Sequence, residues 1–127
     1  DRPAGDQVFV AWTGAMLAGF VLMGPPTEPV PRDCCEIKHL FVRAELQGRG
    51  IGRRLLAEAA RRALGLGFTR LGLGVVDGNG PAIAFYAAVG GKPSGSYTDP
   101  GPRWRSHNLL FVWEDLPALA ARWGPTH

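Results

Sequence analysis

The sequence has few cysteines: there are two among 127 residues, and they are adjacent, Cys34 and Cys35. Two adjacent cysteines exclude a disulfide framework and every C-x-x-C metal or redox motif. We therefore expect ordinary thiols at a strand edge, in preference to a cysteine that carries an acyl group. The same scarcity favours a reducing, cytoplasmic setting.

Long apolar runs are also missing. The longest, Ala15–Met23, is about half of what a bilayer span requires, and no basic-then-apolar leader precedes it. The charge is unremarkable as well, because the net charge of +3 is small and the arginines are spread along the chain. We expect neither a membrane nor a nucleic acid as partner. Length and a hydrophobic content of 46% fit a single domain over residues 1–127.

The first third of the chain contains three strand patterns. Val8–Trp12 and Ala15–Met23 are apolar runs separated by the turn residues Thr13-Gly14, which predicts a hairpin. Gly24–Asp33 carries four prolines and must be a loop. Glu36–Val42 follows as a third strand and ends in three consecutive apolar residues, as a strand does where it enters a buried sheet.

Two segments have the pattern of helices. After Ile51, apolar residues recur at helical spacing until the glycines Gly65 and Gly67. The second helix begins at Asn79, whose side chain can cap it, with a proline in its first turn, and it stops at Gly90.

The remaining elements are strands and a short helix. Leu71–Val76 alternates bulky residues with glycine, so one face of this strand has no side chains and lets a backbone or a ligand approach closely. Tyr97 and Leu109–Trp113 are the last strand candidates, and Asp115 caps a terminal helix that Gly124-Pro125 ends. This order predicts an α/β or α+β fold, in which a mixed sheet packs against helices.

The residues before the first helix favour a phosphate site. Gly48, Gly50 and Gly52 remove side chains from a helix N-terminus, where unpaired N–H groups and the positive end of the helix dipole face an anion. The motif is not a P-loop, because no Gly-Lys-Ser/Thr follows. It is not a dinucleotide fingerprint either, because Arg53 replaces the third glycine.

Two motifs in this arrangement resemble the GNAT superfamily of N-acetyltransferases. Gln47-Gly-Arg-Gly-Ile-Gly52 fits the Q/R-x-x-G-x-G/A signature, and Asn79-x-x-Ala-x-x-Phe-Tyr-x-x-x-Gly90 is similar to the second signature. The resemblance covers roughly Val8 to Leu116 and implies a mixed, mostly antiparallel sheet flanked by helices. Members of the family usually have an aromatic residue after the last glycine of the second signature, whereas this sequence has Gly91. The opening strand and two helices of the family have no counterpart, which implies an N-terminally incomplete domain.

The resemblance implies that acetyl-coenzyme A is the acetyl donor, held without a metal ion. Its pantetheine arm is expected along the main chain of one strand and beside the cap of the second helix, and its pyrophosphate at the glycine cluster. The residues implied are Leu40, Phe41 and Val42, then Gln47, Gly48, Arg49, Gly50, Ile51 and Gly52, and finally Asn79.

Three residues receive catalytic roles from the resemblance. Tyr86 corresponds to the usual general acid, and the Val42 N–H is the expected oxyanion donor. Glu36 lies eleven residues before Gln47, the spacing of a general-base glutamate, although a surface strand glutamate is the competing interpretation. Strand parity puts Glu36 on the side of Val42, and His39, a packed or surface residue or an alternative base, on the other side.

The function implied is transfer of an acetyl group from acetyl-coenzyme A to a primary amine, by direct attack in a ternary complex. The acceptor is a small-molecule or peptide amine that the sequence does not identify, and a homodimer is possible. The alternative is a non-catalytic module that binds acyl-coenzyme A on the same fold.

Overall fold

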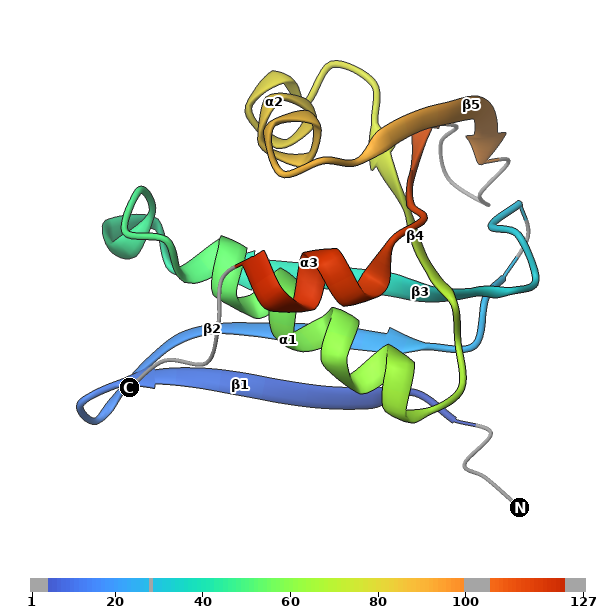
Figure 1. Cartoon of the computed structure of the whole chain (residues 1–127). Helices are drawn as coiled ribbons and strands as arrows, with labels where there is room; N and C mark the ends of the chain where they lie inside the picture. The colour runs from blue at the N-terminus through green and yellow to red at the C-terminus, as the bar shows by residue number, and fades with distance from the viewer. Residues whose placement is uncertain (1–4, 28, 100–105, 123–127) are drawn as a thin grey trace.

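The computed structural model of the protein describes residues 5–27, 29–99 and 106–122. Three strands come first, then two helices that flank a fourth strand, and finally two strands and a short helix (Figure 1). They are β1 (Gln7–Thr13), β2 (Met16–Gly24), β3 (Cys34–Val42), a 3-10 turn (Ala44–Leu46), α1 (Ile51–Gly65), β4 (Arg70–Val76), α2 (Gly80–Ala88), β5 (Lys92–Asp99), β6 (Ser106–Trp113) and α3 (Leu116–Arg122).

In the described residues, six strands form one sheet in the order β1-β2-β3-β4-β6-β5. Four neighbouring pairs are antiparallel, and only β3 and β4 are parallel, with α1 as the connection between them. The predicted mixed, mostly antiparallel sheet with helices is confirmed. The N-terminal hairpin and the bounds of α1 also agree with the sequence patterns.

The last two strands are longer than the sequence indicates. β5 runs over the whole of Lys92–Asp99, although Pro93 and Gly95 are poor strand formers. β5 lies at the sheet edge, where proline is tolerated, and its pairing with β6 shifts register between Pro93 and Ser96. Pairing therefore overrides propensity in this segment. The predicted end of the last helix at Gly124-Pro125 lies outside the described residues.

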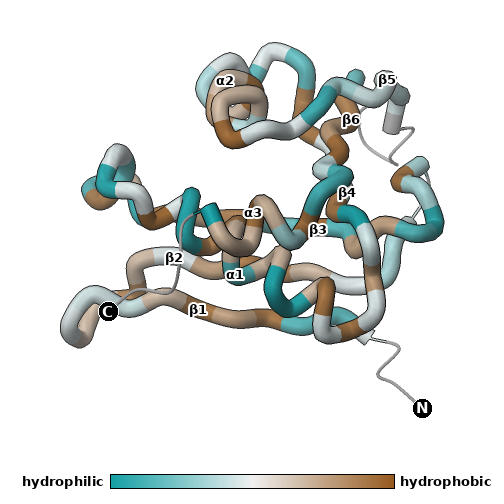
Figure 2. Tube along the Cα trace, viewed as in Figure 1, coloured by the Kyte–Doolittle hydropathy of each residue, from teal (hydrophilic) through white to brown (hydrophobic). Residues whose placement is uncertain are grey.

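The main core lies between the sheet and the three helices. Figure 1 shows α1 and α3 side by side across β1–β3, and Figure 2 shows hydrophobic residues along these strands. Leu56 of α1, Leu116 of α3 and the strand residues Val21 and Leu71 are fully buried in this core. We call this side of the sheet the helix face. No helix in the described ranges is long and apolar enough to cross a membrane.

The other side of the sheet, here called the open face, carries a smaller cluster. Val30 from the loop before β3 packs with Cys34, Leu110 and Val112. Exposed apolar side chains continue across β1 and β3 on this side, namely Val8, Val10, Trp12 and Phe41. Among the described residues, the two faces therefore differ: helices cover one face, whereas the small cluster around Val30 packs on the other.

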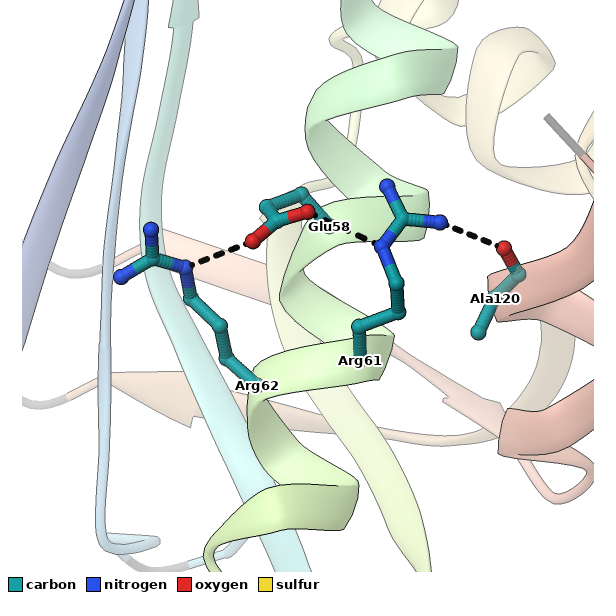
Figure 3. Close-up of polar contacts among 4 residues, drawn as sticks. All are labelled: Glu58, Arg61, Arg62 and Ala120. Carbon is teal, nitrogen blue, oxygen red and sulfur yellow. Dashed lines mark hydrogen bonds and ion pairs between the residues drawn. The ribbon is translucent and has the colours of Figure 1, made fainter. Parts of the chain in front are cut away.

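A forked ion pair within α1 positions an arginine that hydrogen-bonds to α3 (Figure 3). Glu58 accepts hydrogen bonds from Arg61 Nε at 2.9 Å and from Arg62 Nε at 3.0 Å. Arg61 also donates to the Ala120 carbonyl at 2.6 Å. Burial raises the pKa of Glu58, but the hydrogen bonds from the two arginines outweigh it, so the net shift is downward. These contacts fix α3 over α1, the helix whose N-terminus carries the glycine cluster.

Candidate active site

A cleft opens between β3 and β4 because their pairing is short. Only Cys34–Glu36 pair with Arg70–Gly72; beyond that point β3 pairs with β2, and β4 pairs with β6. The closed end is held by Arg70, which donates to the Asp33 carboxylate from Nε at 2.9 Å and from Nη2 at 2.6 Å. This hydrogen bonding lowers the pKa of Asp33. The two strands therefore form a wedge that is fixed at one end.

A groove of about 470 Å³ lies on the helix face at the open end of this wedge. It takes residues from β3, from the turn and glycine cluster, and from the first turns of α1 and α2. Its lining residues are Leu40, Val42, Leu46, Gln47, Gly48, Gly50, Ile51, Gly52, Arg53, Asn79, Pro81, Ala82, Phe85 and Tyr86. The sequence-predicted residues are thus largely gathered in one groove.

The N-terminus of α1 has the conformation of an anion site. Gly48 and Gly50 have φ angles of +84° and +82°, a left-handed conformation that favours glycine. No side chain caps the helix, and its first backbone bond runs from Arg54 N to Gly50 O. The amides of Ile51 and Gly52 precede that bond, so they have no partner within the helix and are available to a ligand oxygen.

Gly52 is required by packing as well as by access. A β-carbon at this position would stand 3.1 Å from Phe85 Cζ and 3.7 Å from Val42 Cγ2. Because Phe85 and Val42 both line the groove, Gly52 lets α2 and β3 approach the start of α1 closely. The width of the groove depends on this missing side chain.

Two side chains hold the glycine cluster in place. Gln47 donates from Nε2 to the Val42 carbonyl at 3.2 Å. Arg54 donates to the Arg49 carbonyl at 3.1 Å and, more weakly, to the Gly50 carbonyl at 3.5 Å. In a trans peptide the N–H points opposite to the C=O, so these contacts turn the next amides, those of Gly50 and Ile51, away from Arg54. Sequence reasoning missed Arg54, whose only signal is its place one turn after the cluster.

Two predicted donor-binding residues do not line the groove with their side chains. The Phe41 ring lies on the open face and stacks on Phe20 with 5.5 Å between ring centroids. Arg49 lines a separate hollow between β1 and α1. Conversely, the groove includes Leu46, Arg53, Pro81, Ala82 and Phe85, which were not predicted as binding residues. Ala82 and Phe85 belong to the apolar stripe of α2, a pattern that sequence alone assigns to the core.

Asn79 and Tyr86 bring α2 to the groove. Asn79 caps the helix as predicted, because its Oδ1 accepts from Ala82 N at 3.3 Å. The Tyr86 ring packs against Phe111 and Trp113 at centroid distances of 6.1 and 5.9 Å. Burial raises the pKa of Tyr86, so its hydroxyl keeps its proton at neutral pH. It is therefore a hydrogen-bond or proton donor at the groove.

Trp113 explains the missing aromatic residue after Gly90. A β-carbon on Gly91 would lie 2.8 Å from Trp113 Cζ2 and 3.0 Å from the Tyr86 carbonyl. Trp113 also donates from Nε1 to the Val89 carbonyl at 3.1 Å. The indole thus packs where a larger residue at position 91 would stand, and Gly91 is buried beneath it.

The strand parity predicted for Glu36 is wrong, because β3 contains a bulge at Lys38. Ile37 pairs with Met23 and His39 with Leu22, so Lys38 is the extra residue. Cross-strand partners share a face; hence Leu40 and Val42 lie on the helix face, whereas Glu36 and exposed His39 lie on the open face.

Glu36 also has a partner that the sequence did not indicate. Its Oε1 accepts hydrogen bonds from Thr27 N and Thr27 Oγ1, both at 2.7 Å. Glu36 is at the same time the last residue of β3 that pairs with β4, opposite Gly72. The carboxylate therefore lies at the point where the cleft begins and anchors the proline-rich loop there.

Two side chains approach the glycine face of β4 closely, where the sequence predicts the close approach of a backbone or a ligand. A β-carbon on Gly72 would stand 3.0 Å from Val30 Cγ1 and 3.4 Å from Cys34 Sγ. On Gly74 it would collide with the Tyr97 hydroxyl. Side chains from the loop before β3 and from β5 therefore pack on this face, where Gly72 is buried and Gly74 stays exposed.

The two cysteines point to opposite faces of the sheet. Cys34 belongs to the open-face cluster and Cys35 to the main core, and both are fully buried. Burial raises the pKa of both thiols, that of Cys35 to about 11. Because the thiolate is the nucleophile, this environment disfavours an acyl-cysteine role.

Comparison with known proteins agrees with this geometry. The family description of the acetyltransferase (GNAT) family matches residues 1–90. This match covers the wedge, the glycine cluster and α2, and it shows that the chain belongs to the GNAT acetyltransferase family. An uncharacterized N-acetyltransferase of Schizosaccharomyces pombe is 34% identical over 64 residues, which are 50% of this chain and 39% of that protein. The chain thus spans less than half of this relative's length.

Solved structures share the fold. A ribosomal-protein-alanine N-acetyltransferase of Brucella melitensis has a TM-score of 0.69 and 29% identity, covering 86% of this chain and 68% of that one. A GNAT family acetyltransferase of Elizabethkingia anophelis, solved with acetyl-CoA bound, has a TM-score of 0.71 and 19% identity, covering 86% and 76%. At that identity the second likeness concerns the fold alone.

The glycine cluster gives a first test. Gly50→Glu introduces bulk and negative charge beside the first amides of α1, and we expect coenzyme A to bind about 100-fold more weakly in calorimetry. Gly67→Glu is the matched control, because Gly67 also has a positive φ angle, at the other end of α1, with open space around it. Equal coenzyme A affinity in the two folded variants contradicts a phosphate site at this helix start.

Proposed function

We propose that the protein is an N-acetyltransferase that moves an acetyl group from acetyl-coenzyme A to a primary amine in a ternary complex. The observation that carries this proposal is that one groove, beside the wedge between β3 and β4, is lined both by the start of α1 with its unpaired amides and by Tyr86 of α2. Acetyl-coenzyme A needs amide donors at its pyrophosphate and a proton donor at its thioester, and the pantetheine arm separates these two groups.

Main-chain groups of β3 and of α1 support this donor site. In the described residues, the stretch of β3 after Glu36 pairs only with β2, so the edge that faces β4 presents main-chain groups to the groove. Leu40 and Val42 of this stretch line the groove, and an amide-rich arm hydrogen-bonds with such an edge as another strand does. The amides of Ile51 and Gly52 then meet the pyrophosphate through charge and dipole.

The reaction forms a bond between the amine nitrogen and the acetyl carbon and breaks the bond between that carbon and sulfur. The Val42 N–H stabilises the negative charge that develops on the carbonyl oxygen. Tyr86 donates its proton to the leaving sulfur, and Glu36 accepts the proton of the attacking amine, directly or through water. The carboxylate suits this role because it lies on the open face, opposite the donor groove.

The alternative is a module that binds acyl-coenzyme A without turnover. Release of free thiol from acetyl-coenzyme A separates the two, measured with n-butylamine, spermidine, alanine amide, a peptide with a free N-terminus and a lysine peptide. We expect amine-dependent release with at least one of them. Binding of coenzyme A with no release above the rate without amine supports the module instead.

Tyr86→Phe tests the general acid. This change keeps the ring against Phe111 and Trp113 and removes only the proton donor, so kcat is expected to fall roughly 100-fold with little change in stability. Burial raises the pKa of Tyr86 above its usual value near 10, so the hydroxyl stays protonated as pH rises. We therefore expect no decrease of kcat from loss of this proton at any pH below about 10. A variant with wild-type kcat, with chemistry rate-limiting, means that another group supplies the proton.

Glu36→Gln tests the general base, with Thr27→Val as its matched partner. Glutamine keeps an oxygen for Thr27 but cannot take a proton, so kcat/KM for the amine is expected to fall roughly 100-fold. The pH profile of this variant should also lack the acidic limb of the wild-type profile. Thr27→Val removes one hydrogen bond to Glu36 and leaves the carboxylate, and it should change kcat/KM much less. Superimposed pH profiles of wild type and Glu36→Gln exclude the base role and leave an already neutral amine as nucleophile.

A further inference from the structure

The open face carries a tyrosine beside the cleft that the donor groove does not use. Tyr97 lies in β5 opposite Asn108 of β6, and its hydroxyl occupies the space that a β-carbon on Gly74 of β4 would take. The side chain therefore reaches back across β6 to β4. Gly74 lies two residues beyond Gly72, the last residue of β4 that pairs with β3. The hydroxyl is thus held over the wall of the cleft just past the point where the strands separate.

The two tyrosines of the chain lie beside the cleft on opposite faces of the sheet. Tyr86 packs against Phe111 and Trp113, which belong to the helix-face core. Gly74 instead pairs with Leu110, a member of the open-face cluster, and cross-strand partners share a face. Tyr97 therefore reaches Gly74 from the open face.

A carboxylate lies on the same side of the cleft. Glu36 is on the open face, opposite Gly72 at the last pair between β3 and β4. Its strand diverges from β4 beyond this pair, whereas Tyr97 approaches from β5 on the other side of β4. A carboxylate on one side of the opening and a phenol hydroxyl on the other form the surroundings that a primary ammonium or amine prefers, because each oxygen accepts an N–H.

The second substrate needs a side of the cleft that the donor does not occupy. The donor groove takes up the helix face, from the start of α1 to Tyr86. A nucleophile must reach the carbonyl carbon from a direction that the donor leaves open, and a donor in the groove on the helix face leaves the opposite side of the cleft, where Glu36 and Tyr97 lie. We propose that the Tyr97 hydroxyl binds the acceptor amine there, accepting a hydrogen bond from its nitrogen, with Glu36 opposite. This assignment rests on the proposed function and gives the acceptor site a side chain from β5.

The geometry also gives Gly74 a role. The hydroxyl can lie at the wall of the cleft only because position 74 has no side chain; with alanine there, the added methyl carbon and the hydroxyl collide. Gly74→Ala therefore moves the hydroxyl without removing it, and Tyr97→Phe removes it without moving the ring. The double variant is expected to lose little more than either single variant, because both act on one contact.

The first experiment uses the full chain labelled with 13Cζ-tyrosine, which gives two signals because the sequence contains two tyrosines. Tyr86→Phe and Tyr97→Phe assign them. Coenzyme A alone should move the Tyr86 signal, and addition of n-butylamine, alanine amide or spermidine to that complex should move the Tyr97 signal. A Tyr97 signal that none of these amines moves overturns the acceptor site. A Tyr86 signal that coenzyme A does not move contradicts the donor groove instead, so the two failures are distinguishable.

The second experiment measures steady-state kinetics with the panel amine that supports the fastest thiol release. Loss of one hydrogen bond to the amine should raise its KM roughly five- to tenfold in Tyr97→Phe and in Gly74→Ala, with the KM for acetyl-coenzyme A unchanged. Thr98→Val is the control, since this exposed neighbour in β5 loses a hydroxyl on the opposite side of the strand. An unchanged KM for the amine in folded Tyr97→Phe, or an equal rise in Thr98→Val, overturns the proposal.

Discussion

The short parallel pairing between β3 and β4 is the constraint on which the site depends. The two strands meet over three residue pairs, closed by the Arg70–Asp33 ion pair, and then turn to different antiparallel partners. A parallel ladder that continued to Val42 would satisfy the main-chain groups of β3 and leave no space for a ligand. Because it stops at Glu36, the same strand supplies a sheet contact at one end and an open edge at the other.

The shape of the groove beside this wedge depends on two glycines that have no side chain. Gly50 allows the left-handed residue that starts α1, and Gly52 lets Phe85 approach within van der Waals contact. Arg54 then fixes the peptide planes of the cluster from outside the groove. Preorganised amides cost little reorganisation when an anion binds, so this rigidity favours the proposed phosphate site.

The sequence predicts well those features that depend on local pattern. The hairpin, α1 and the Asn79 cap follow from periodicity and capping chemistry, which act over a few residues. Prediction from the sequence fails where contacts with distant segments determine the local structure. The long edge strand β5 forms because β6 pairs with it, and Val30 and Tyr97, from other parts of the chain, pack on the glycine face of β4. Neither partner is visible in the spacing of Leu71–Val76 itself.

The bulge at Lys38 has a consequence for how this chain is compared with its relatives. One extra residue in a strand changes which face every residue before it presents, while the distance along the chain to the glycine cluster grows by only one. Two relatives with glutamates in the same alignment column can therefore carry them on opposite sides of the sheet. Insertions and deletions of a single residue in β3, which alignments treat as minor, therefore change the face of the sheet on which the carboxylate lies.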